Sequence, residues 1–89
     1  MIARGFFREA LMKSIQISLA MAQSVKEFVR IVQDYPGEIL LKSGKYVVDA
    51  KSILGIFSLD LSGPVTMEIY GAGADGLIAN LGKFMQTDE

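Results

Sequence analysis

Two short stretches of the sequence carry residue types whose spacing could support chemistry. Residues 71–76, Gly-Ala-Gly-Ala-Asp-Gly, spell G-x-G-x-x-G after an alternating apolar segment and before a helical one, an arrangement that binds the pyrophosphate of dinucleotides. The second stretch is Lys51-Ser52, at the start of a short apolar segment. A serine placed there can cap a helix by accepting a backbone N–H.

The glycine motif lacks the remainder of a dinucleotide site. Such a site needs a following parallel strand with an acidic residue about 20 positions further on, which binds the ribose. Glu89 is the last residue, 13 positions after Gly76 (89 − 76 = 13). We therefore expect these glycines to form a turn between a strand and a helix, and we expect no cofactor.

No other catalytic constellation is evident in the residue types. The chain has no histidine and no cysteine, and its carboxylates are scattered singly, so the usual zinc, thiol and serine–histidine sites cannot be built. The formal net charge of −1 provides no general positive field for nucleic acid or an anionic membrane. We expect a protein that is not an enzyme, with no metal site and no nucleic-acid or membrane partner.

Length and composition indicate one apolar core. The chain has 89 residues, of which 51% are apolar, and domains usually run to about 100–150 residues. It contains no run of 18 or more apolar residues and no uninterrupted apolar stretch of the kind that a signal peptide needs. These features predict a cytoplasmic protein held together by apolar packing.

Apolar spacing predicts the secondary structure that positions Ser52. Period-two alternation marks strands and a spacing of three or four marks helices. Ser24 and Glu27 match a capping box at the start of the first helix, and Ser43-Gly44 fits the turn of a hairpin. The predicted elements are a strand near 13–19, a helix at 25–34, a hairpin of strands 38–42 and 45–48, a helix at 52–59, a strand at 65–70 and a helix at 75–86.

The order β-α-β-β-α-β-α predicts an α+β domain with a four-stranded antiparallel sheet covered on one face by three helices. Ferredoxin-like RNA-binding domains share much of this order, but the segment 45–49 has one aromatic residue where their strand motif needs two or three. Residues 1–11, which contain Arg4, Phe6, Phe7 and Arg8, are expected to form an extension. It is either a helical or frayed appendage or a basic aromatic arm that docks elsewhere.

Residues 44–59, GKYVVDAKSILGIFSL, resemble the middle of HPr, the histidine-containing phosphocarrier protein of the bacterial sugar phosphotransferase system. There, a G-K-x-V strand leads into K-S-I-M-G-V-M-S-L. Element order and apolar pattern extend the resemblance more loosely over residues 13–85. It implies the HPr-like open-faced β-sandwich, with residues 12–89 as the HPr-like domain.

The resemblance implies different outcomes for the two phosphorylation sites of that family. Its regulatory serine falls on Ser52. Its carrier histidine, in the pattern H-A-R-P at the start of the first helix, falls on Met21 when residues are counted back without gaps, or on Ser24 when strand one and the capping box are aligned. Neither side chain has an imidazole nitrogen, so we expect no phosphoryl relay through histidine.

The chain is similar to HPr relatives in which the histidine is replaced and the serine is kept, such as the catabolite-repression HPr homologue. This similarity implies an HPr kinase or a transcriptional regulator as the protein partner. The expected docking residues are Lys51, Ile53, Leu54, Gly55, Ile56 and Phe57. The alternative is an unmodified interaction or oligomerisation domain, for instance a homodimer, in which Ser52 is only a structural helix cap.

Overall fold

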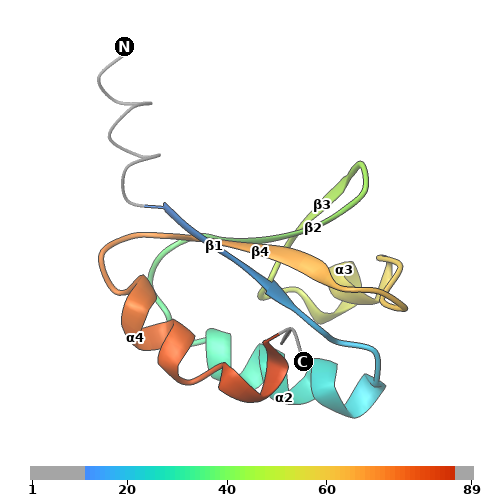
Figure 1. The fold of residues 1–89 in the computed structure, drawn as a ribbon, viewed down its shortest axis with the longest axis horizontal. Coiled ribbons are helices and arrows are strands. Elements are labelled where there is room, and N and C mark those ends of the chain that lie inside the picture. Colours follow the sequence, from blue (N-terminus) through green and yellow to red (C-terminus); the bar gives the residue numbers. More distant parts are fainter. Residues whose placement is uncertain (1–11, 86–89) are drawn as a thin grey trace.

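The structure is a computed structural model in which residues 12–85 are described (Figure 1). The extension predicted for residues 1–11 and the last residues, 86–89, lie outside the described part. The order of elements is as predicted: β1 Met12–Ile17, α2 Ala22–Val32, β2 Ile39–Ser43, β3 Tyr46–Asp49, α3 Ile53–Phe57, β4 Val65–Tyr70, α4 Ala74–Ala79 and a short 3-10 turn, η1, at Gly82–Phe84.

The four strands form one antiparallel sheet in the order β1-β4-β2-β3. β4 lies inside the sheet, where Met67 pairs with Ile15 of β1 on one side and with Leu41 of β2 on the other. The helices lie on one side of the sheet, with α2 and α4 beneath it in Figure 1. The predicted α+β fold class, an open-faced sandwich of one sheet and three helices, is confirmed.

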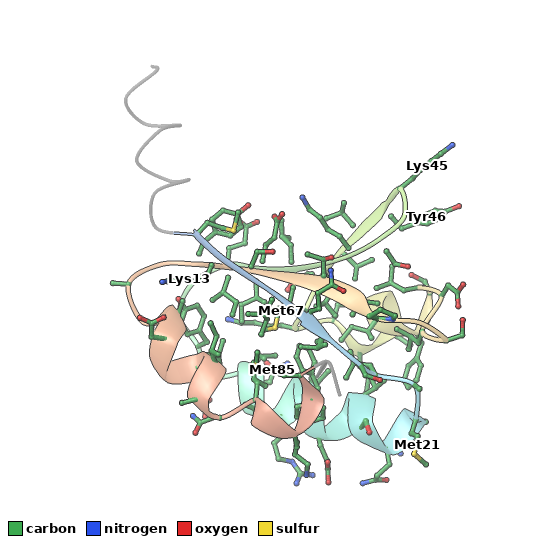
Figure 2. The ribbon with its side chains drawn as sticks, viewed as in Figure 1. Lys13, Met21, Lys45, Tyr46, Met67 and Met85 are labelled. Atoms are coloured by element: carbon green, nitrogen blue, oxygen red, sulfur yellow. The ribbon has the colours of Figure 1, made fainter. Side chains whose placement is uncertain are left out.

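The core lies between the sheet and the helices. Val65, Met67 and Ile69 alternate along β4 and are completely buried, and Figure 2 shows Met67 between the sheet and the helices. From the helix side, the ring of Phe28 meets that of Phe84 edge to face, with centroids 5.8 Å apart. Burial of one such side chain stabilises the fold by about 1.5–3 kcal/mol, so apolar packing can hold this small domain.

Helix α2 begins earlier than the capping box predicted. It starts at Ala22, because the Met21 carbonyl already accepts the N–H of Val25 at 3.2 Å. Ser24 therefore lies inside the first turn and caps nothing, and the Glu27 carboxylate binds Lys83 Nζ at 3.0 Å instead. The predicted capping box is wrong.

The predicted helix 75–86 is interrupted. α4 ends at Ala79, and the chain continues through i to i+3 hydrogen bonds, such as Leu81 N–H to Ile78 O at 2.9 Å, into η1. Asn80 and Gly82 have low helix propensity, which explains the break. Met85 does not extend the helix but forms an isolated bridge with Ile17, and this bridge ties the end of the chain to β1.

The glycine motif is part of the packing around Tyr35. The Tyr35 hydroxyl donates to the Tyr70 carbonyl at 2.8 Å, and Gly71, with φ +114°, and Gly73 lie against the hydroxyl and the ring. A Cβ on Gly37 would lie 2.3 Å from the Tyr70 oxygen and 2.7 Å from the ring. Gly71 and Gly73 lie in the turn between β4 and α4, as predicted for the motif, and Gly37 allows the close approach to Tyr70.

One ion pair lies on the face of the sheet that the helices leave uncovered. Lys42 Nζ is 2.9 Å from Glu68 Oε2, and the Tyr70 hydroxyl donates to the other carboxylate oxygen at 3.0 Å. The bond from Lys42 lowers the pKa of Glu68, and the same bond raises the pKa of Lys42. The pair links β2 to β4 across the sheet.

Candidate functional site

Ser52 is the N-cap of α3, as predicted. Its backbone is extended, at φ −102° and ψ 105°, and its Oγ accepts the N–H of Gly55 at 3.1 Å. The Ser52 carbonyl accepts the N–H of Ile56 at 3.0 Å, the first backbone bond of the helix. Ser52 is nevertheless exposed, so the hydroxyl caps the helix and remains accessible from solvent.

The loop that carries Ser52 is fixed by hydrogen bonds on both sides. The Asp49 carboxylate accepts the N–H of Lys51 at 2.9 Å, and the Asp49 carbonyl accepts the N–H of Ser52 at 3.0 Å. From α2, the Gln33 side chain donates to the Lys51 carbonyl at 3.0 Å. These bonds join residues 49–52 to one another and to α2, so Ser52 lies on a hydrogen-bonded turn.

The Lys51 ammonium does not face Ser52. Its Nζ donates to the backbone carbonyl of Tyr35, just after α2, and the side chain is partly buried. This bond uses one of the three N–H groups of the ammonium and holds the side chain toward the end of α2. Lys51 therefore helps to position the loop, and the expectation that its side chain docks a partner stays a prediction.

The expected docking residues divide into exposed and buried side chains. Leu54 is 81% exposed and Phe57 is 45% exposed on this helix of five residues. Ile56 is completely buried in the core and cannot touch a partner while α3 is folded, so it does not belong to the surface. Ile53 is half-buried and packs against the core.

Gly55 has a structural role in this turn. A Cβ placed on Gly55 would lie 3.2 Å from Ser52 Oγ and 3.4 Å from the Cβ of Val48. The missing side chain therefore lets α3 lie close to β3 while Ser52 retains its cap. Gly55 contributes to the site by allowing this close packing.

Met21 is the residue at the start of α2. It occupies the N-cap position with an extended backbone, at φ −107° and ψ 139°, and its side chain is 69% exposed. Figure 2 shows it projecting from the beginning of the helix. Ser24, the other candidate for the position of the carrier histidine, is half-buried within the first turn.

The described residues give little support for other kinds of site. An open hollow lies between the β2–β3 turn and the loop after α3, lined in part by Tyr46, Ser58 and Asp60, but it includes none of the residues expected to form the site. Hydrogen bonds from Ser62 lower the pKa of the Asp60 carboxyl group.

Within residues 12–85, no group of three acidic, histidine or cysteine side chains could hold a metal ion, and no helix is long and apolar enough to cross a membrane.

Comparison with known proteins identifies a matching family. The family model described as "PTS HPr component phosphorylation site" matches residues 20–87. The matched segment contains the start of α2 and the Ser52 turn, together with strands β2, β3 and β4. No curated protein matches this chain.

Two solved structures resemble the chain over most of its length. A phosphocarrier protein HPr from Bacillus anthracis str. Ames is 28% identical, with a TM-score of 0.68, and the match covers 84% of this chain and 95% of that protein. HPr-C-His from Thermoanaerobacter tengcongensis is 27% identical, with a TM-score of 0.65, and the match covers 81% and 86% of the two chains. The likeness therefore extends to both sequence and fold.

Proposed function

The chain belongs to the HPr family of the phosphotransferase system, and we propose that it acts there as a non-catalytic, protein-binding domain controlled through phosphorylation of Ser52. The observation that carries this proposal is the exposed Ser52 hydroxyl on a hydrogen-bonded turn, followed by the exposed apolar side chains of Leu54 and Phe57. As part of the same proposal, the protein works in the cytoplasm.

In this proposal, the chain relays no phosphate through histidine. We place the position of the family's carrier histidine at Met21, because Met21 precedes α2 whereas Ser24 lies inside it. A thioether has no basic nitrogen that could attack phosphorus, and the chain contains no histidine elsewhere. Incubation with the phosphoenolpyruvate-dependent enzyme that loads HPr should leave the chain unlabelled.

Phosphorylation of Ser52 would act as a change of surface charge. A kinase would remove the hydroxyl proton while an Oγ–phosphorus bond forms and the bond to the leaving nucleotide breaks. The product adds about −1.5 to −2 charges beside the first N–H groups of α3. The Lys51 side chain is held toward Tyr35 and Asp49 is close along the chain, so in this proposal the added charge is presented to a partner.

The partner surface of this proposal consists of Leu54 and Phe57. An exposed apolar pair beside a site of variable charge suits a protein that recognises both features, such as an HPr kinase or a transcriptional regulator. Apolar contacts would supply affinity, and the phosphate would set whether the partner is bound. The buried Ile56 and the clamped Lys51 support this surface from within.

Binding to a purified bacterial HPr kinase, measured by calorimetry, tests the surface directly. Leu54→Ser and Phe57→Ser should each weaken binding by about tenfold, as expected when an exposed apolar anchor is truncated. Tyr46→Ser removes a comparably exposed apolar side chain, 69% exposed on the hairpin, and should leave binding unchanged. Equal affinity for all four proteins would refute a docking surface on α3.

The alternative function is an unmodified interaction domain in which Ser52 is a cap only. The observed hydrogen bond from Gly55 is compatible with it, since a cap needs no modification. The two functions differ in whether an HPr kinase transfers phosphate to Ser52, and this difference can be measured on the intact chain.

A further inference from the structure

Strand β3 forms an outer edge of the sheet and exposes apolar side chains. It follows β2 in the order β1-β4-β2-β3, with no further strand beyond it among the described residues. Tyr46 is 69% exposed and Val47 is 52% exposed. The β2–β3 hairpin projects away from α2 and α4 in Figure 1, and Figure 2 shows Lys45 and Tyr46 extending from its tip. An exposed apolar edge strand is a template for pairing with another strand.

The hydrogen-bond pattern of the hairpin leaves the backbone of Val47 pointing outward. Ala50 N–H donates to the Ile39 carbonyl at 2.9 Å, and hydrogen-bonded pairs alternate along an antiparallel ladder. Ser43 with Tyr46 and Leu41 with Val48 are therefore the bonded pairs between β2 and β3, which makes Lys42 with Val47 an unbonded pair. The N–H and the carbonyl of Val47 thus face away from the sheet.

The edge is complementary to itself in one register. When two copies of β3 run antiparallel with Val47 opposite Val47, Tyr46 lies opposite Val48 of the other copy, and Lys45, in the turn that precedes β3, lies next to Asp49 of the other copy. The centre of this pairing is apolar and both ends carry opposite charges, which is the favourable arrangement for cross-strand pairs. Shifting the copies so that Val48 lies opposite Val48 would set Val47 against Asp49 and Lys45 against Lys51, which is unfavourable.

We propose that β3 pairs with β3 of a second copy of this chain, in the register that places Val47 opposite Val47, so that two sheets join into one. The pairing is two-fold symmetric, and the same surface serves both copies. Five residues per copy are far fewer than the about 20–30 per side of a standard interface, so the dimer is weak and depends on concentration. This inference does not depend on phosphorylation of Ser52.

Sedimentation equilibrium on the intact chain and its Val47 variants tests this proposal. The wild-type chain should associate as its concentration rises towards the millimolar range. Val47→Glu and Val47→Lys should each weaken association by about tenfold or more, because like charges then face each other at the centre. An equimolar mixture of the two variants should associate again, because Glu and Lys then lie opposite each other. The N–H and carbonyl of Val47 make no bond to β2, but each new side chain lies opposite Lys42 of the same sheet, so circular dichroism is used to check that each variant is folded.

The register and the surface are tested separately from association itself. In the shifted register, Val47→Lys would face Asp49 and would strengthen association, so that result would overturn the proposal. Leu54→Glu, a charge introduced at an exposed apolar residue of α3, should leave association unchanged. A wild-type chain that stays monomeric, a mixture that does not associate, or a loss of association with Leu54→Glu alone would each overturn the proposal.

Discussion

Ser52 Oγ accepts the backbone N–H of Gly55 at 3.1 Å, so the hydroxyl that caps α3 is the same group for which we propose phosphorylation. The bond is local, between residues three apart, and a missing Cβ on Gly55 leaves room for it. Capping and signalling can therefore be separated only by variants that treat the two roles differently.

Ser52→Ala should remove the cap and lower the free energy of unfolding by about 1 kcal/mol, measured by urea denaturation. Ser52→Asp should retain most of that free energy, because a carboxylate oxygen can also cap the helix. Ser14→Ala, at an exposed serine of β1, is the matched control and should change stability little. If Ser52→Ala and Ser14→Ala lower the free energy of unfolding by the same amount, Ser52 does not stabilise the fold as a cap.

Lys51→Met should destabilise the fold although Lys51 is a charged residue close to the surface. The variant removes the ammonium that binds the Tyr35 carbonyl, and a hydrogen bond from a charged group contributes about 1.5–3 kcal/mol. Because this side chain is only half-buried, a loss of about 1–2 kcal/mol is expected in the same denaturation assay. Lys26→Met, at an exposed position of α2, should change the free energy of unfolding little. An equal loss of stability in Lys51→Met and Lys26→Met would contradict a stabilising bond between Lys51 and the Tyr35 carbonyl.

Gly37→Ala should be destabilising because the added methyl group would lie 2.3 Å from the Tyr70 carbonyl oxygen. Backbone and ring would have to shift, which costs on the order of 1–3 kcal/mol. At Gly63 a Cβ would meet nothing within 4 Å, so Gly63→Ala is the control and should be neutral or slightly stabilising. Melting temperatures of the two variants give the comparison, and similar values would refute close packing at Gly37.

The ion pair between Lys42 and Glu68 should make stability depend on pH at both extremes. The folded-state pKa of Glu68 lies below its ordinary 4.5, so its contribution is present above that pH and is lost as the pH falls through the folded value. The pKa of Lys42 lies above its ordinary 10.5, so its contribution is full below that pH and is lost as the pH rises through the folded value.

Glu68→Gln should therefore flatten the acid side of the stability curve measured by urea unfolding between neutral and acid pH. The Glu68 side chain is 13% exposed, whereas Asp75, paired with Lys13 at 3.6 Å, is 82% exposed. Such an exposed pair contributes little, which makes Asp75→Asn the control. An acid limb that is as steep in Glu68→Gln as in the wild-type chain would contradict this role for the carboxylate.

Local signals in the sequence were sufficient for most of the fold. The hairpin follows from Gly44, whose φ of +59° is the left-handed conformation that glycine adopts readily. The cap at Ser52 involves only Gly55, three residues further along the chain. The strands follow from the period-two alternation of apolar and polar residues. Each of these predictions depends on neighbours within a few positions along the chain.

Two of the errors arose where distant residues decide the structure. Ser24 and Glu27 match a capping box, yet the helix begins before them and Lys83, 56 positions from Glu27, takes its carboxylate. Lys51 bonds to a carbonyl 16 positions away, so its side chain could not be assigned from the local sequence. The exposure of Tyr46 and Val47 depends on strand order, and a strand pattern does not say which strand lies at an edge.

Intact-mass measurement after incubation with two phosphoryl donors tests the central claim most directly. One reaction contains an HPr kinase with ATP, and the other contains the phosphoenolpyruvate-dependent enzyme that loads HPr. Wild-type HPr, which both enzymes should label, is the positive control, and Ser52→Ala is the matched variant. The account predicts a single added phosphoryl group at Ser52 with the kinase and none with the second enzyme. Label from the second enzyme alone, or no kinase label on the folded wild-type chain while HPr is labelled, would contradict it.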